Sequence, residues 1–235
     1  QIAKDIGCRL TLWEPIEENG AWDYAIDQLN RLITEKTKLL IVNFPHNPTG
    51  YSPRKEEQLE IIKICRKNDV YIFSDEMYRF LDHTQRAHLP SMCDVYEKSI
   101  SLWGTSKTFG LAGVRIGWIT SKDRGLLQKV ENFKDYLSIC SSAPSEILAT
   151  IALNNLDYFL QRNLEKIRHN IELFQIFQKK HKALFDFQAP PTSSTAFVRF
   201  HLESSTAEFA ENLVKETGIM LLPSEAFEYG TKHAR

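Results

Sequence analysis

Four short apolar runs, separated by segments with helical spacing, constrain the fold of this chain most strongly. The runs comprise residues 38–42, 70–74, 99–103 and 114–120. Each suits a strand that is buried on both faces and is too short for a core helix. Residues 22–33 have helical spacing, and Ser52 with Pro53 predicts the start of a second helix that runs to about residue 68. The alternation predicts an α/β fold whose mostly parallel sheet is sandwiched by helices.

The second half of the sequence has a different pattern. Residues 144–181 have helical spacing, with a predicted break near Asn154 and Asn155. A loop and a strand follow, and Ser205 with Glu208 predicts a capping box that opens a further helix. Residues 219–223 predict one more strand. This part therefore indicates a smaller α+β unit.

These patterns predict two structural parts. We expect residues 1–155 to form part of a large domain and residues 156–235 to form part of a small C-terminal domain. The chain begins with Gln1 rather than Met, and its last residues interrupt a predicted strand. Both ends are therefore expected to be cut from a longer protein.

Composition excludes several classes of protein. The formal net charge of −1 gives no excess of basic residues that would indicate nucleic-acid binding, and the longest apolar runs are too short to span a membrane. The four cysteines are widely spaced, without a CxxC pair: Cys8, Cys65, Cys93 and Cys140. We expect no disulfide framework, no metal site and a cytoplasmic location.

Three polar residues follow the ends of three predicted strands. Asn47, Asp75 and Lys107 supply an amide, a carboxylate and an amine. Because ligands of parallel α/β sheets bind beyond the carboxyl ends of the strands, we expect one crevice to contain all three. Lys107 lies among small residues, and burial there would lower the pKa of its amine and favour a Schiff base with a carbonyl.

Pyridoxal 5'-phosphate offers such a carbonyl, and the sequence supplies groups for its other parts. Asp75 is a candidate partner for the ring nitrogen, which must stay protonated to withdraw electrons. Tyr78 and Asn47 are candidate donors to the phenolic oxygen. Ser106 and Arg115, with Thr105 as a further hydroxyl, are candidate phosphate ligands.

Three motifs carry a resemblance to a known family. The stretches NPTG at 47–50, SDEMY at 74–78 and TSKTFGLAGVRIGW at 105–118 resemble the class I/II aminotransferases, which are fold-type I pyridoxal-phosphate enzymes. The resemblance implies that Lys107 is the Schiff-base lysine and proton shuttle. It implies amino-group transfer between an amino acid and a 2-oxo acid, in a homodimer.

The same resemblance extends to the end of the sequence. Arg235, in KHAR, resembles the arginine that binds the substrate α-carboxylate, and Asn47 is expected to face the substrate as well. The family often has Ser or Thr where this chain has Gly104, which removes one expected phosphate contact. The family also has a longer N-terminal part, which would add a phosphate-binding loop and an aromatic ring stacked on the cofactor.

GTSKT resembles part of a phosphate-binding P-loop, but it lacks the glycines that a P-loop has immediately before and six residues before its lysine.

Other interpretations of the candidate residues stay open. Taken singly, Asp75 suits a helix cap, Tyr78 a core tyrosine, Asn47 a turn and Arg115 a surface ion pair. A lyase or decarboxylase would use the same cofactor machinery. A non-catalytic effector domain of a transcription regulator would need a DNA-binding module elsewhere in the protein.

Overall fold

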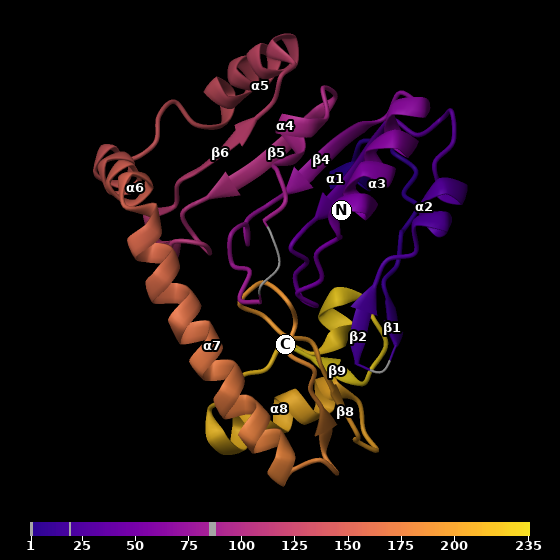
Figure 1. The fold of residues 1–235 in the computed structure, drawn as a ribbon, viewed down its shortest axis with the longest axis vertical. Coiled ribbons are helices and arrows are strands. Elements are labelled where there is room, and N and C mark those ends of the chain that lie inside the picture. Colours follow the sequence, from indigo (N-terminus) through magenta and orange to yellow (C-terminus); the bar gives the residue numbers. More distant parts are fainter. Residues whose placement is uncertain (1, 19, 85–87) are drawn as a thin grey trace.

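A four-stranded sheet forms the centre of the upper half of the molecule (Figure 1). The computed structural model describes residues 2–18, 20–84 and 88–235. The strands, in their order across the sheet, are β3 (Leu39–Asn43), β4 (Tyr71–Asp75), β5 (Ser99–Gly104) and β6 (Gly117–Thr120). The first three are parallel, which confirms the predicted mostly parallel α/β sheet.

β6 differs from its prediction in two ways. It begins at Gly117 rather than at residue 114, because a 3₁₀ turn, η1 (Ala112–Val114), precedes it. It also runs antiparallel to β5, with Gly104 opposite Gly117. A parallel pair needs a long crossover, and the chain between β5 and β6 is a loop that reverses direction at one edge of the sheet.

Three helices cover one face of this sheet, namely α2 (Ile26–Leu32), α3 (Lys55–Lys67) and α4 (Met92–Val95). Their apolar side chains form one core with alternate residues of the strands: Leu29, Ile33, Leu40, Val42, Ile61, Ile62, Ile64, Cys65, Val70, Ile72, Met92 and Tyr96. Burial of this set stabilises the sheet at about 25 cal/mol per Å² of apolar surface. The core fixes the strands whose carboxyl ends carry the candidate site.

Two details of this region were wrong in the sequence prediction. The helix predicted to open at Ser52 begins later, with Arg54 as its N-cap, because the Glu57 carboxylate accepts the Arg54 backbone N–H. Leu39 and Ile41 were expected to be buried. They alternate with Leu40 and Val42, project away from the core and are 48% and 62% exposed.

Helices connect the central sheet to the C-terminal part. The chain continues through α5 (Arg124–Leu137), α6 (Ala143–Asn154) and the long α7 (Leu156–Lys180). The helix break at Asn155 is as predicted. Figure 1 shows α7 descending from the level of the central sheet to the lower part of the molecule.

The C-terminal part contains a small antiparallel sheet. Its strands are β7 (Phe185–Asp186), β8 (Val198–Phe200) and β9 (His233–Ala234). The predicted capping residue is confirmed, because Ser205 accepts the Glu208 N–H at the start of α8 (Thr206–Thr217). Residues 219–223 do not form the predicted strand. Only Leu222 and Pro223 pair with the end of the chain, before the turn η2 (Ser224–Phe227).

The N-terminal residues pack against this C-terminal sheet. After α1 (Ile2–Asp5), a hairpin of β1 (Ile16–Glu18) and β2 (Ala21–Asp23) precedes α2. Trp22 therefore lies in a strand and not in the helix that its spacing predicted. Its indole contacts the rings of Phe197 and His233, and this tertiary packing outweighs the local pattern.

Among the residues that the structure describes, no helix combines the length and apolar character needed to cross a bilayer. The four cysteines are free thiols, and Cys65 is buried in the core.

Candidate functional site

Asp75 ends β4 at the carboxyl edge of the sheet. Its Oδ1 accepts the backbone N–H of Met77 at 3.1 Å, which is the local turn that a capping interpretation would predict. Burial raises the pKa of the Asp75 carboxyl, and the nearby Glu76 raises it further, while the hydrogen bond from the Met77 N–H and the adjacent Asn43 side chain oppose the shift. Asp75 forms no ion pair with any described residue, so a cation placed beside it would stabilise its ionised form.

Asn47 lies in a tight loop just beyond β3. Within that loop, His46 donates its N–H to the Tyr51 carbonyl at 2.7 Å, and Gly50 donates to the His46 carbonyl at 2.7 Å. The Asn47 N–H bonds Oδ1 of Asn43 at 2.7 Å. These bonds leave the Asn47 side chain to interact outside the loop, and its Oδ1 accepts a hydrogen bond from Arg235.

Tyr78 is close to three of the other candidate residues. Tyr78 is buried, with 3% of its surface exposed, and the Lys107 amine lies 5.8 Å from its ring centroid. Burial raises the pKa of the Tyr78 hydroxyl. Arg235 opposes this shift and Asp75 adds to it, so both charges lie near the hydroxyl. The structure thus brings Tyr78, Lys107, Asp75 and Arg235 together.

Lys107 lies in the loop between β5 and β6, and backbone bonds close that loop at its base. Thr105 donates both its N–H and its hydroxyl to the Ile116 carbonyl, each at 3.0 Å. Asn163 of α7 donates to the Thr108 carbonyl at 2.8 Å. The Lys107 side chain itself is exposed, whereas the sequence predicted a buried lysine; its small neighbours form an open edge rather than a closed pocket.

The loop also contains the three candidate phosphate ligands. Ser106 is half-buried beside Lys107, and Arg115 is exposed with its Nη1 donating to the Ala112 carbonyl at 3.1 Å. Arg115 forms no ion pair with any residue that the structure describes, so nothing supports the alternative interpretation of a surface ion pair. Thr105 is fully buried, and its hydroxyl is already used in closing the loop. This leaves Ser106 and Arg115 as the accessible candidates.

Arg235 is held by both its backbone and its side chain. Its N–H and C=O pair with the C=O and N–H of Leu222 at 2.9 and 3.0 Å. Its Nη1 donates to Oδ1 of Asn47 at 2.8 Å, and its guanidinium lies 5.6 Å from the Phe227 ring centroid. The final residue of the sequence is thus fixed next to the NPTG loop.

Sequence reasoning missed Asn43 as a site residue. Asn43 lies opposite Asp75 in the β3–β4 register and bonds both Asp75 and Asn47. A signal was present in the sequence, because Asn43 is a polar residue that ends a buried strand, as Asp75 is. The NPTG motif drew the prediction to Asn47, which lies four residues beyond the strand end.

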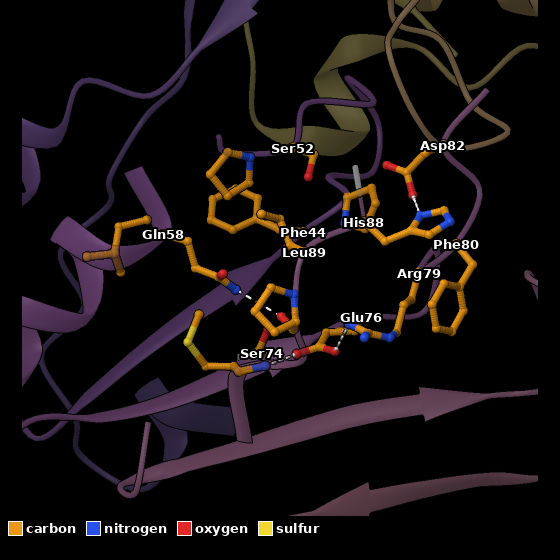
Figure 2. A pocket seen from close by; sticks show the side chains of 15 residues that line it. Phe44, Ser52, Gln58, Ser74, Glu76, Arg79, Phe80, Asp82, His88 and Leu89 are labelled. Atoms are coloured by element: carbon orange, nitrogen blue, oxygen red, sulfur yellow. Dashed lines mark hydrogen bonds and ion pairs between the residues drawn. The ribbon is translucent and has the colours of Figure 1, made fainter. Parts of the chain in front are cut away.

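Two concave regions lie outside this cluster. Figure 2 shows the first, whose lining includes Phe44, Gln58, Glu76, Arg79 and His88. Its volume of about 40 Å³ suits a few water molecules and not a cofactor. Glu76 accepts hydrogen bonds there from Ser91, Ser101 and the Met92 N–H, which supports its structural interpretation.

The second region is a groove of about 430 Å³ between the β1–β2 hairpin, the NPTG loop and residues 188–191. Its described lining includes Trp22, Tyr51 and Phe197 but not Asp75, Tyr78 or Lys107. The candidate residues therefore line an open edge of the sheet and not either of these concavities.

The edge combines an amine, a carboxylate, a phenol and a guanidinium around the carboxyl ends of parallel strands. Comparison with known proteins gives the class. The family described as "Aminotransferase class I and II" matches residues 4–235, and the chain belongs to that family. The fold is that of the fold-type I pyridoxal-phosphate aminotransferases, as the solved structures show.

Individual relatives are similar over part of their length. Capreomycidine synthase of Streptomyces vinaceus is 26% identical over 96% of this chain and 57% of its own. Aromatic-amino-acid aminotransferase 2 of Thermococcus litoralis is 27% identical over 91% and 55%. A solved PLP-dependent aminotransferase from Streptococcus suis has a TM-score of 0.92 and 30% identity over 100% of this chain and 61% of its own. The chain thus spans a little over half of the length of these two curated relatives.

Proposed function

We propose that this chain belongs to an enzyme that transfers an amino group between an amino acid and a 2-oxo acid, with pyridoxal 5'-phosphate as cofactor. One observation carries the proposal. The Lys107 amine, the Tyr78 ring and the Asp75 carboxylate converge at one sheet edge, where Arg235 reaches Asn47. Membership of the aminotransferase family supports the same reaction.

The donor set of this edge fits the cofactor. When bound, pyridoxal phosphate supplies a carbonyl that condenses with amines and a ring that withdraws electrons. The exposed Lys107 amine would form the covalent link, and after release it would hold and move the proton at the substrate Cα. Asp75 would hold a proton on the ring nitrogen, since its half-buried carboxylate has no cationic partner among the described residues.

The remaining residues would bind and orient. Tyr78 and Asn47 would donate to the phenolic oxygen, and Arg115 with Ser106 would bind the phosphate. Arg235 would bind the substrate carboxylate, since a guanidinium that is already oriented by Asn47 and Leu222 loses little freedom on binding. We include a division at residue 155, a homodimer, a cytoplasmic location and the absence of nucleic-acid and membrane partners in the proposal.

A lyase or decarboxylase on the same scaffold is the second candidate. The observation that favours it is the relative named capreomycidine synthase, whose name does not describe amino transfer. The residues discussed above would bind the cofactor equally in either reaction. The products separate the two, because transamination yields a 2-oxo acid without loss of carbon dioxide or of a side-chain group. An effector domain of a transcription regulator would bind the cofactor and release neither product.

The full-length protein with added cofactor provides the test. Borohydride reduction followed by peptide mapping should locate the cofactor on Lys107, and a screen of amino donors with a 2-oxo acid acceptor should show turnover. Lys107→Ala should abolish both signals. Lys63→Ala, which removes an exposed lysine paired with Glu60 on α3, is the matched control and should change neither. Cofactor attached to another lysine would overturn the assignment.

A further inference from the structure

The side-chain amide of Asn43 joins two parts of the candidate site. Its Oδ1 accepts the Asn47 N–H at 2.7 Å, and its Nδ2 donates to the Asp75 carbonyl at 3.1 Å. Asn43 and Asp75 are opposite each other at the ends of two parallel strands, so the amide spans the gap between β4 and the NPTG loop. Both the oxygen and the nitrogen of the Asn43 amide therefore form hydrogen bonds within the candidate site.

We propose that Asn43 is a positioning residue that fixes the Asn47 loop against the end of β4, and so sets the separation between Asn47 and Asp75. The inference rests on the proposed function, in which Asp75 faces the ring nitrogen and Asn47 the phenolic oxygen. Asn43 itself is half-buried and acts through these two residues.

The acceptor half of the amide fixes the NPTG loop. Without Oδ1 the Asn47 N–H would lose its partner, and a part-buried donor without a partner is costly enough to shift the loop. The Asn47 side chain would move with its backbone. Since Arg235 donates to that side chain, the substrate end of the site would loosen too.

The donor half acts on Asp75. The Asp75 carbonyl also accepts the Phe44 N–H at 3.1 Å, so the strand pairing would survive without Nδ2. The Asn43 side chain also lowers the pKa of the Asp75 carboxyl against the effects of burial and of Glu76. Loss of Nδ2 should therefore change the pKa of the Asp75 carboxyl more than it weakens the pairing of β3 with β4.

Two substitutions separate the effect of the acceptor Oδ1 from that of the donor Nδ2. Asn43→Ala removes both atoms. Asn43→Asp keeps an oxygen for the Asn47 N–H and replaces the donor with a negative charge next to that of Asp75. Asn68→Ala is the matched control, because Asn68 bonds the Ile64 carbonyl at the end of α3, away from the site. Each variant is compared with the parent full-length protein by thermal melting before the other measurements.

The first measurements use cofactor-free protein. In Asn43→Ala, hydrogen exchange at the Asn47 amide should accelerate about tenfold, while Asn43→Asp should stay close to the parent. NMR titration of the Asp75 carboxyl should give a higher midpoint in Asn43→Ala and a higher one still in Asn43→Asp. Parent-like exchange and titration in Asn43→Ala would show that the amide positions nothing.

The second measurements use the loaded protein. Asn43→Ala should raise both the cofactor Kd and the amino-acid KM by about three- to tenfold, the loss expected for one hydrogen bond. Asn43→Asp should keep KM within about twofold of the parent, because the loop bond remains. Equal losses in Asn68→Ala, or a KM that rises equally in both Asn43 variants, would overturn the proposal.

The two sets of measurements also separate this inference from the proposed function. A parent protein that binds no pyridoxal phosphate would refute the proposed function and the role of Asn43 beside a cofactor, even if amide exchange still responded. A parent that binds the cofactor through Lys107, with Asn43→Ala unchanged in Kd and KM, would refute the positioning role alone.

Discussion

Arg235 donates a hydrogen bond from Nη1 to Oδ1 of Asn47 at 2.8 Å, although the two residues are 188 positions apart in the sequence. The bond ties the end of the C-terminal sheet to the loop beyond β3. It orients a guanidinium at the edge where Lys107 and Tyr78 also lie. The two halves of the chain therefore share one candidate site.

Arg235→Lys tests that orientation. An ammonium cannot form the planar, two-point contact that a guanidinium makes with a carboxylate. We expect KM for the amino acid to rise by about ten- to a hundredfold, with kcat within about threefold of the parent. Steady-state kinetics check this, with Arg199→Lys in the neighbouring strand as control. An unchanged KM would remove Arg235 from the substrate site.

Asp75→Asn tests the proposed electrostatic role of Asp75 toward the ring nitrogen of the cofactor. The amide preserves the shape of the side chain but cannot stabilise a protonated nitrogen. Turnover should fall by about a thousandfold, while the covalent link to Lys107 still forms. Single-turnover kinetics and borohydride trapping measure the two effects, with Asp27→Asn as an exposed control on α2. Near-normal turnover would leave Asp75 with its local turn as its only role.

Gly104→Ala tests why this chain lacks a hydroxyl residue at the end of β5. A Cβ on Gly104 would lie 2.9 Å from the Ile116 carbonyl oxygen and 3.0 Å from the Gly117 Cα, so the β5–β6 pair would have to shift. We expect a loss of about 1–3 kcal/mol in the free energy of unfolding.

Gly113→Ala provides the contrast within the same motif, because nothing lies within 4 Å of a Cβ there. Chemical denaturation should show Gly113→Ala within about 0.5 kcal/mol of the parent. Equal stability of the two variants would mean that the strands adjust to a side chain at Gly104 without cost.

We expect the free energy of unfolding to depend on pH through His46. Burial lowers the pKa of its imidazole from 6.5 to about 4, so the folded state takes up this proton later than the unfolded state as the pH falls. The contribution of His46 to stability is thus complete above about 6.5 and is lost as the pH falls towards 4. His83 and His233 also have lowered pKa values and act in the same direction.

His46→Asn isolates the contribution of His46 to this pH dependence. Between the two pKa values, the slope of unfolding free energy against pH should become shallower by up to about 1.4 kcal/mol per pH unit. Denaturation curves at several pH values measure the slope, and His169→Gln, on the exposed face of α7, is the control. A slope equal to that of the parent would contradict a His46 whose pKa is lowered in the folded protein.

The sequence predicted the parts of the fold that local patterns determine. The apolar runs marked β3, β4 and β5, and Ser205 marked the start of α8, because burial and capping act over a few residues. The predictions for Trp22 and for residues 219–223 were wrong because local patterns do not determine the structure there. Their structure depends on partners far along the chain, such as Phe197 and Arg235, that no local window contains.

For the candidate site, motifs at the predicted strand ends were enough to name the residues. They were not enough to predict the burial and hydrogen bonds of those residues. The exposure of Lys107, the use of the Thr105 hydroxyl in closing the loop and the fixed backbone of Arg235 all depend on tertiary contacts. The Asn43 bonds depend on the register of β3 with β4, which the sequence left unspecified.

The closure of the β5–β6 loop by Thr105 has one further consequence. Because two hydrogen bonds join Thr105 to Ile116, Lys107 and Arg115 lie within one closed loop. The distance between the lysine proposed to bind the cofactor and the arginine proposed to bind its phosphate therefore depends on this closed loop rather than on the loops that surround it.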